Sequence, residues 1–437
     1  MDRRTFMRSG SVATVALLAN AERTLAQAQE APAAPLPPRA RPGLIGGSGQ
    51  RGVLTPNGRS LPLREVNGVR VGHLIASEFE HEFAPGLRVR AWGYNGSTPG
   101  PTIEAVEGER LRIYVTNRLP EPTTVHWHGL IVPNGMDGVS ALTQRPIPPG
   151  ETWVYEFELR QSGTFMYHSH YDEMTQIALG CVGMFVVHPR RPVGPQVQRD
   201  FVLMSHEWKV DVGTSRPDAN SMADFNILTF NGKIFPATEP LIVGTGERVR
   251  IRLGNLGPMD HHPIHIHGLF FEEVATDGGP TPVSARRPET TCLVPVGATR
   301  TIEFVATEPG DWAMHCHMTH HVMSQMGHGL PLLIGANMAQ VDRRMRSLVP
   351  GYMTMGAEGM GGMADMQMRI PPNSVPMRGG PGPFGTIEMG GMFTVVKVRD
   401  EPDAPNAGDW FVHPPGTQTH VADAAAMASD GIDPNAH

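Results

Sequence analysis

The sequence predicts an all-β protein made of two Greek-key β-sandwich domains. The chain of 437 residues is rich in glycine (50 residues) and proline (41 residues), as expected for many short strands joined by turns. Polar and apolar residues alternate at 110–115 and 248–253, and this period of two indicates half-buried strands. An internal repeat sets the number of domains at two.

The repeat consists of an aromatic-Asn-Gly turn, a short apolar segment after a proline, and a strand that begins Gly-Glu-Arg. It occupies residues 94–113 in the first copy and 230–251 in the second. Paired histidines follow both copies in the same order, so each copy is interpreted as a domain with its own core. We expect the first domain at residues 61–190 and the second at 198–336.

The start of the chain has the features of an export signal. Arg3 and Arg4 precede a weakly apolar stretch at 11–18, and Ala26-Gln27-Ala28 is a plausible cleavage site. This pattern predicts a twin-arginine signal peptide at residues 1–28, and therefore a periplasmic or secreted protein.

Two further segments lie outside the predicted domains. Residues 29–60 are rich in proline, glycine and alanine and predict a flexible lead-in. Residues 337–437 form a tail with six methionines between 353 and 368, while 391–398 has the pattern of a single strand. No apolar run reaches the length of about 18 residues that a transmembrane helix needs, so we expect no membrane span.

Charge and cysteine content bear on two further properties, nucleic-acid binding and disulfide bonding. The net charge of −7 gives the chain no electrostatic reason to bind nucleic acid. Of three cysteines, Cys181 and Cys292 belong to no motif. An oxidising compartment permits a disulfide between them, but two buried free thiols are the preferred interpretation.

The strongest functional signal is a set of paired histidines. Residues two apart on a strand project to the same face, so each His-x-His unit can hold one small object. Four such units occur: His126 and His128, His168 and His170, His265 and His267, and His315 and His317. Cys316 lies inside the last unit, and His321 and Met326 follow it at steps of five residues. A thiolate, imidazoles and a weak axial thioether together favour copper.

These motifs, of the form HxHG, HxH, HxxHxH and HCHxxxHxxxxM in this order, resemble those of the multicopper oxidases, the family of laccases and cuprous oxidases. The resemblance spans about residues 61–336. It implies a cupredoxin fold for each domain and four coppers, one of type 1, one of type 2 and two of type 3. It also implies one-electron oxidation of a small reducing substrate coupled to reduction of dioxygen to water.

The resemblance assigns roles residue by residue. It gives the type 1 copper to His262, Cys316, His321 and Met326, whereas Thr123, Ser169, Met174 and Leu179 occupy the corresponding positions of the first domain. It gives the type 2 copper to His126 and His265, one type 3 copper to His128, His168 and His317, and the other to His170, His267 and His315. Cys316 would link the electron-entry site to the cluster, because its chain neighbours are type 3 ligands.

Asp137 matches an acid of the family and is the candidate proton donor, although a turn before Gly138 also explains it. Val322 stands where some relatives have a second carboxylate. Asp172 and Glu173 are alternatives that no motif supports.

Two substrate classes remain open. A laccase-like oxidase would act on phenols or aromatic amines, whereas an oxidase of Cu(I) or other metal ions would serve copper tolerance. Clustered thioethers bind soft Cu(I) and favour the second class, unless the tail is low-complexity sequence without a ligand. A copper nitrite reductase is disfavoured because Ser169 replaces the required cysteine in the first domain. A scaffold without copper is disfavoured because every ligand position is filled.

The division of the histidines predicts an oligomer. Each domain supplies four of the eight cluster histidines, and no middle domain holds the two sets together. Related two-domain oxidases pair the first domain of one subunit with the second domain of the next. We therefore expect a homotrimer with the cluster between subunits.

Overall fold

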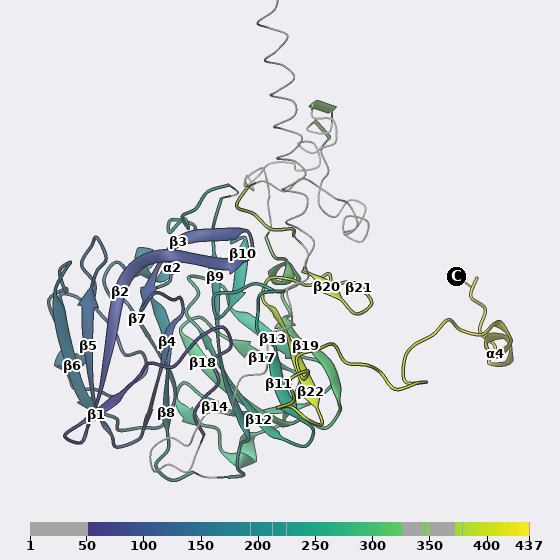
Figure 1. Ribbon diagram of the computed structural model, residues 1–437, viewed down its shortest axis with the longest axis horizontal. Helices are drawn as coiled ribbons and strands as arrows, with labels where there is room; N and C mark the ends of the chain where they lie inside the picture. Colours follow the sequence, from purple (N-terminus) through teal and green to yellow (C-terminus); the bar gives the residue numbers. More distant parts are fainter. Residues whose placement is uncertain are drawn as a thin grey trace, which may run out of the picture. The chain divides into compact units, whose positions relative to one another are not determined.

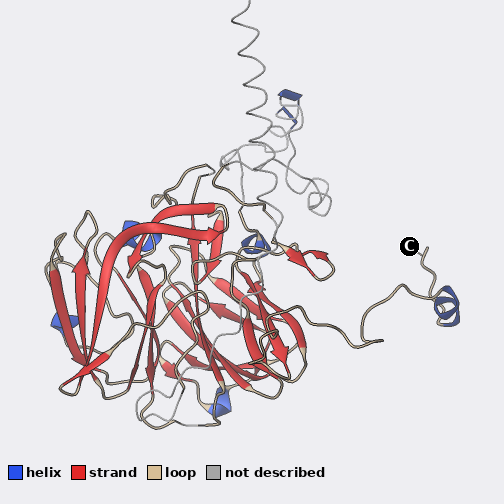
Figure 2. Ribbon diagram, viewed as in Figure 1, coloured by secondary structure: helices blue, strands red, loops and turns tan. Residues whose placement is uncertain are grey.

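A computed structural model of the chain is drawn in Figure 1. The structure describes residues 51–325 and 372–436, except positions 193, 212, 224 and 378, and two short pieces at 343–344 and 347–348. The twin-arginine segment 1–28, residues 29–50, Met326 and the six methionines at 353–368 lie outside the described residues. The regular elements of the described residues are nearly all strands, with only a few short helices, which confirms the all-β prediction (Figure 2).

The first domain is a β-sandwich. Its larger sheet has the order β1 (Arg64–Val66), β2 (Val69–Ala84), β5 (Arg110–Asn117) and β6 (Thr152–Glu158), with β3 (Leu87–Tyr94) paired to β2. Its smaller sheet has the order β4 (Gly100–Val106), β8 (Val182–His188) and β7 (Gly163–His168). Short helices η1 (Asn134–Met136) and α2 (Glu173–Ala178) lie in the connections. Alternate residues of β5 are buried, which is the pattern that predicted this strand.

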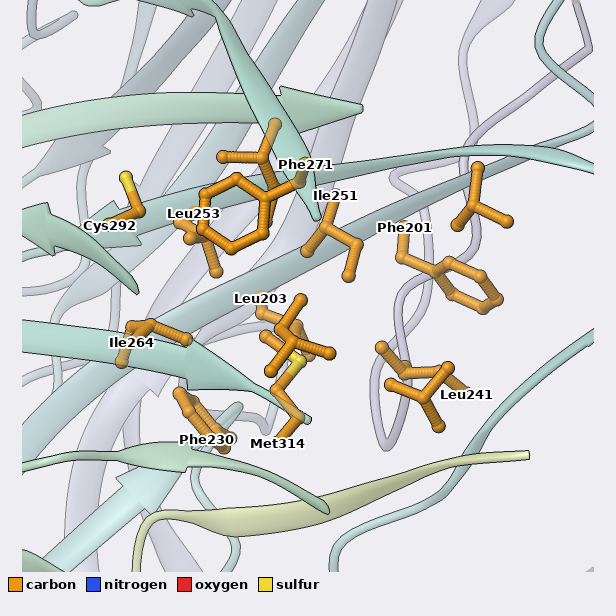
Figure 3. Close-up of a cluster of buried hydrophobic side chains, with 14 of the residues drawn as sticks. Phe201, Leu203, Phe230, Leu241, Ile251, Leu253, Ile264, Phe271, Cys292 and Met314 are labelled. Carbon is orange, nitrogen blue, oxygen red and sulfur yellow. The ribbon is translucent and has the colours of Figure 1, made fainter. Parts of the chain in front are cut away.

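The second domain repeats this plan. One sheet has the order β10 (Ile227–Phe230), β9 (Arg199–Trp208), β12 (Arg248–Asn255), β18 (Ala298–Val305), β14 (Phe271–Thr276) and β15 (Gly279–Pro280), with β16 (Pro288–Glu289) on β14. The facing sheet has the order β11 (Leu241–Gly244), β22 (Phe393–Arg399), β19 (Gly310–Cys316), β13 (His262–Ile266) and β17 (Thr291–Val294). Figure 3 shows apolar side chains from both sheets meeting in one core.

Short elements connect or follow these sheets: η2 (Val283–Ala285), η3 (Thr319–Val322), the pair β20 (Pro381–Gly382) and β21 (Gly385–Thr386), and α4 (Ala424–Ser429). Among the described residues, no helix has the length and apolar character that a membrane span requires. Cys181 and Cys292 are free buried thiols in the cores of different domains, in agreement with the preferred interpretation.

The internal repeat is visible in the strand register. β2 runs parallel to β5 with Ala76 opposite Asn117, and β9 runs parallel to β12 with Ser205 opposite Asn255. Both asparagines donate through Nδ2 to two backbone carbonyls at the same place in the fold. This register gives the correspondence of positions between the two domains.

Two segments differ from the sequence-based expectation. Strand β22, which the sequence assigned to a tail, lies inside the second domain, where it pairs with β11 in parallel and with β19 in antiparallel orientation. Its register could not be read locally because its partners are far away in the sequence. Residues 51–60, expected as part of a flexible lead-in, pack on the domains instead. Val53 and Leu54 are buried, and Leu54 forms a bridge with Phe201 of β9.

The two sandwiches share an apolar contact. Side chains of β7 and β8, among them Met166 and Met184, pack against Val202 and Met204 of β9. A buried ion pair adds a polar connection, because Arg252 donates to Asp200 and also to the hydroxyl of Thr164 in the first domain. A buried arginine with these partners keeps its hydrogen-bonding groups satisfied.

Candidate metal centres

Three predicted ligands meet in the core of the second domain. His262 begins β13, Cys316 ends the neighbouring strand β19, and His321 lies in η3 directly after it. Sγ of Cys316 is 3.5 Å from Nδ1 of His321 and 3.8 Å from Nδ1 of His262, and the two nitrogens are 3.3 Å apart. All three side chains are buried. Met326, the predicted axial ligand, lies outside the described residues.

This triangle fits a transition-metal ion. In a trigonal site with bonds of about 2.0 to 2.3 Å, ligand atoms are separated by about 3.5 to 4.0 Å. The observed separations are close to this range, and a set of two imidazoles and one thiolate is the donor set of blue copper.

Burial favours the neutral forms of the Cys316 thiol and the His321 ring while no cation is bound. It raises the pKa of the Cys316 thiol to about 12 and lowers the pKa of His321 to about 4. A metal ion must therefore displace the thiol proton, so its binding releases a proton.

The outer nitrogens of both imidazoles face carboxylates. Nε2 of His262 is 3.3 Å from Oε2 of Glu207, and both side chains are completely buried. Nε2 of His321 is 3.6 Å from Oδ2 of Asp260, whose side chain is 33% exposed. Nε2 of His262 therefore faces the buried core, whereas Nε2 of His321 faces a carboxylate that solvent can reach. The sequence analysis missed Glu207 because it lies on a wholly buried strand and matches no local motif.

The corresponding place in the first domain holds a polar network instead of ligands. Thr123 and Ser169 both donate to Oε1 of Gln176, at 2.8 and 2.5 Å, and Gln176 donates to the carbonyl of Pro122. Gln176 is fully buried, whereas Met174 is 63% exposed. Three mutually bonded neutral side chains leave no thiolate or imidazole for a metal there.

The paired histidines form two clusters, one in each domain. In the first domain, His126, His128, His168 and His170 have neighbouring ring centroids 5.3 to 6.0 Å apart. In the second, the separations for His265, His267, His315 and His317 are 4.8 to 5.7 Å. Two close pairs stand out: His128 Nδ1 with His168 Nε2 at 3.3 Å, and His267 Nε2 with His315 Nε2 at 3.2 Å.

Backbone carbonyls orient four of these rings. Nδ1 lies 2.7 to 2.9 Å from a carbonyl oxygen in His126, His168, His265 and His315. Because a carbonyl only accepts, each Nδ1 donates, and Nε2 keeps a free lone pair. Metal-binding histidines are commonly fixed in this way through their second nitrogen.

The two clusters are separate within one chain. All eight rings are described, and no ring contact joins the two sets. His267 and His317 are exposed, which leaves the second cluster open to solvent. Exposed apolar residues lie beside both clusters in the sequence: Ile131 (58%) and Met174 (63%) in the first domain, Phe270 (72%) and Met318 (42%) in the second.

Two carboxylates approach the first cluster. Oδ1 of Asp137 is 3.4 Å from Nδ1 of His126, and the carbonyl oxygen of the same aspartate accepts from that ring. Gly138 follows at φ +84°, where a Cβ atom would meet the carbonyl of Val125 at 1.8 Å. The tight turn therefore holds Asp137 against the ligand strand. Glu173, which no motif supported, has Oε1 3.1 Å from Nε2 of His170.

The fold and the donor sets define a copper protein with a mononuclear centre and clustered imidazoles. Two regions of the chain, residues 76–192 and 211–331, match family models described as multicopper oxidase. Together they cover more than half of the sequence, so the chain belongs to the multicopper oxidase family. Copper is the metal of this family, and the donor set of His262, Cys316 and His321 fits it.

Relatives with specific names match part of the chain. Copper resistance protein A of Escherichia coli is 29% identical over 287 residues, which is 54% of this chain and 47% of that protein. Laccase-1 of Cryptococcus neoformans var. grubii is 40% identical over 220 residues, which is 43% of this chain and 35% of that protein. The chain therefore spans less than half the length of these curated relatives.

A solved structure supports the same fold. The blue copper oxidase from Nitrosomonas europaea superimposes with a TM-score of 0.57 at 24% sequence identity, covering 78% of this chain and 90% of that chain. At this identity the similarity establishes the fold alone.

Proposed function

We propose that the protein is an oxidase that couples one-electron oxidation of a small reducing substrate, a phenol or aromatic amine, to four-electron reduction of dioxygen to water. The observation that carries this proposal is the position of Cys316. It faces His262 and His321 in the buried triangle, while its chain neighbours His315 and His317 belong to the imidazole cluster of the second domain. The electron-entry centre and the cluster are thus joined through consecutive residues.

The ligand sets follow the family assignment. His262, Cys316, His321 and Met326 would hold the type 1 copper; His126 and His265 the type 2 copper; His128, His168 and His317 one type 3 copper; and His170, His267 and His315 the other. Bound copper supplies the electron transfer and the activation of dioxygen. The close pairs His128–His168 and His267–His315 support two members of each type 3 set.

The chain's own residues prepare these sites. Backbone carbonyls hold four of the eight rings through Nδ1, and burial around Cys316 excludes water from the mononuclear site. Asp137 is proposed to deliver protons for oxygen reduction, because its carboxylate lies against His126 and is 29% exposed, and therefore reachable by water.

The active unit is proposed to be a homotrimer. Neither cluster in one chain has the imidazoles of both domains, and both are flanked by exposed apolar residues. Pairing the first domain of one copy with the second domain of the next would complete three equivalent clusters. Export by the twin-arginine route to the periplasm or outside the cell is part of the same proposal.

A second candidate function is the oxidation of Cu(I) or another metal ion for copper tolerance. Asp260 is favourably placed, because its partly exposed carboxylate approaches Nε2 of His321, and the neighbouring Met259 is 49% exposed. Residues 324–325, close to His321 in the sequence, are hydrogen-bonded to residues 375–377, which follow the methionine-rich segment. Ser324 donates to the carbonyl of Met377, and Val375 donates to Oε1 of Gln325.

The test is steady-state oxygen uptake by the copper-loaded protein, with a phenol, an aromatic diamine, Cu(I), Fe(II) and Mn(II) compared at equal concentration. The laccase-like proposal expects the organic donors to give the largest kcat/KM. A strong preference for Cu(I) would replace it with the second function. No uptake with any donor by protein that carries all four coppers would refute both.

A further inference from the structure

A buried carboxylate lies directly behind the proposed type 1 ligand His262. Glu207 is the penultimate residue of β9, and its side chain is fully buried. Its Oε2 is 3.3 Å from Nε2 of His262, while Nδ1 of the same ring faces Cys316. One imidazole therefore connects the metal position to a carboxylate that no solvent reaches.

The carboxylate is held in place by the backbone. Oε1 of Glu207 accepts from the amides of Met259 at 2.5 Å and Asp260 at 2.7 Å. Once Nδ1 of His262 ligates a metal, its Nε2 carries the ring proton, and this nitrogen faces Oε2 of Glu207. A carboxyl group that faces three donors in this way is favoured in its ionised form, so Glu207 places a negative charge behind the ligand.

Gly257 makes room for this carboxylate. A Cβ atom at residue 257 would lie 1.7 Å from Oε2 and 2.5 Å from the carboxyl carbon of Glu207. The backbone at this glycine is not left-handed, so an L residue fits its torsion angles. Glycine is therefore required at position 257 because a side chain would collide with Glu207, and not because of the backbone conformation.

The first domain serves as an internal comparison. Gly257 donates its amide to Oδ1 of Asn255, and Leu119 makes the same bond to Asn117, so these two positions correspond. Leu119 is a buried core residue. The strand register places Glu78 at the position of Glu207, but there the carboxylate accepts from Nε1 of Trp92. The domain without type 1 copper ligands therefore has neither the glycine nor a carboxylate directed at the type 1 ligand position.

We propose that Glu207 is a positioning residue of the type 1 copper site, which fixes the ring of His262 and supplies a buried negative charge that favours Cu(II) over Cu(I). This inference rests on the proposed function. Cu(II) with a thiolate carries one positive charge more than Cu(I) with a thiolate, so a fixed anion in a low-dielectric interior stabilises the oxidised form more strongly. Reduction adds one electron, and no proton transfer is needed.

Two substitutions separate the charge from its position. Glu207→Gln keeps the size of the side chain and an acceptor for the two amides but removes the charge. Gly257→Ala keeps the charge but forces the carboxylate away from Nε2 of His262. The matched control is Glu104→Gln, because Glu104 forms a second buried pair, with His188 at 2.7 Å. That pair lies at the end of β8 opposite to the end where Val182 pairs with His168.

The measurements use full-length copper-loaded protein: visible absorption, electron paramagnetic resonance, redox titration of the type 1 band, and copper affinity by competition with a chelator. We expect both variants to weaken type 1 copper binding by about 10- to 100-fold, the usual cost of losing such an outer partner. We expect Glu207→Gln to raise the reduction potential, with each tenfold loss of preference for Cu(II) corresponding to about 59 mV.

The proposal would be overturned if, in both variants, the copper affinity and the preference for Cu(II) over Cu(I) derived from the potential stayed within twofold of the parent. Equal effects from Glu104→Gln would also overturn it. If Glu207→Gln does not fold, as judged by thermal unfolding of the metal-free protein, the copper affinity and potential of Gly257→Ala alone test the proposal. A parent protein that binds copper without a type 1 spectrum would refute the proposed function instead, so the two failures are distinguishable.

Discussion

At the scale of single residues, Cys316 is the side chain that no other residue can replace. It is the only thiol that contacts the two buried imidazoles, because Cys181 lies in the core of the first domain and Sγ of Cys292 donates to Glu273. Its strongly raised pKa in the absence of metal means that copper must ionise it on binding. The intense blue band of such a site arises from charge transfer between this sulfur and copper.

Cys316→Ser is therefore expected to abolish the blue band and all turnover. The imidazole clusters keep their own ligands, so about three coppers per subunit should remain. Visible spectroscopy, copper analysis and oxygen uptake on the same preparation check this, with Cys181→Ser as the control that stays blue. An intense band that survives in Cys316→Ser would contradict the assignment.

The histidines of the proposed type 2 site give a complementary test. In His126→Ala or His265→Ala, loss of one ligand should deplete type 2 copper and stop oxygen reduction. The buried triangle is untouched, so substrate should still bleach the blue band under anaerobic conditions. Electron paramagnetic resonance and anaerobic bleaching are the measurements. His320→Ala, an exposed histidine beside His321 and off the motif spacing, is the control. Full turnover of either ligand variant would show that these histidines are structural.

At the scale of strands and loops, the features that could be predicted from the sequence are those that neighbouring residues encode. Alternation in β5 and β12 and the repeated turns were sufficient for two sandwiches, and His-x-His spacing was sufficient for the clusters. β22 was not predicted in its sheet because its pairing with β11 and β19 spans a long insertion. Gln176 and Glu207 were missed for a related reason, since their partners come from other elements and leave no pattern in the neighbouring sequence.

The insertion between η3 and β22 carries the six methionines, and its flanks are hydrogen-bonded to each other next to His321. If the thioethers recruit Cu(I), deletion of residues 353–368 should lower Cu(I) oxidation at low copper concentration and leave phenol oxidation unchanged. A variant with all six methionines changed to leucine keeps length and apolar character, and it should show the same selective loss. Both activities are measured at equal copper content. Equal loss of both would indicate a folding role, and no loss of either would favour the laccase-like function.

At the scale of the whole molecule, the division of the imidazoles between two domains is the dominant constraint. Four rings lie in each domain, the two sets do not touch within one chain, and two rings of the second set are exposed. Under the proposed ligand assignment, a lone subunit would hold the buried mononuclear copper but would bring only four of the eight imidazoles to each larger cluster. Copper that bridges two subunits would also stabilise the assembly, because it binds the assembled form alone.

We accordingly expect the active copper-loaded protein to have the mass of a trimer by light scattering. Phe270 is 72% exposed and three residues after His267, so Phe270→Asp should introduce an unpaired charge into the interface without disturbing a core. This variant should become monomeric, lose oxygen reduction, and keep the blue band, since the buried triangle needs no partner. Phe384→Asp, at a residue 77% exposed on the β20–β21 turn, is the matched control and should remain trimeric and active. A parent protein with monomer mass and full oxygen reduction would refute the shared cluster, because one chain would then have to bring both sets of rings together by itself.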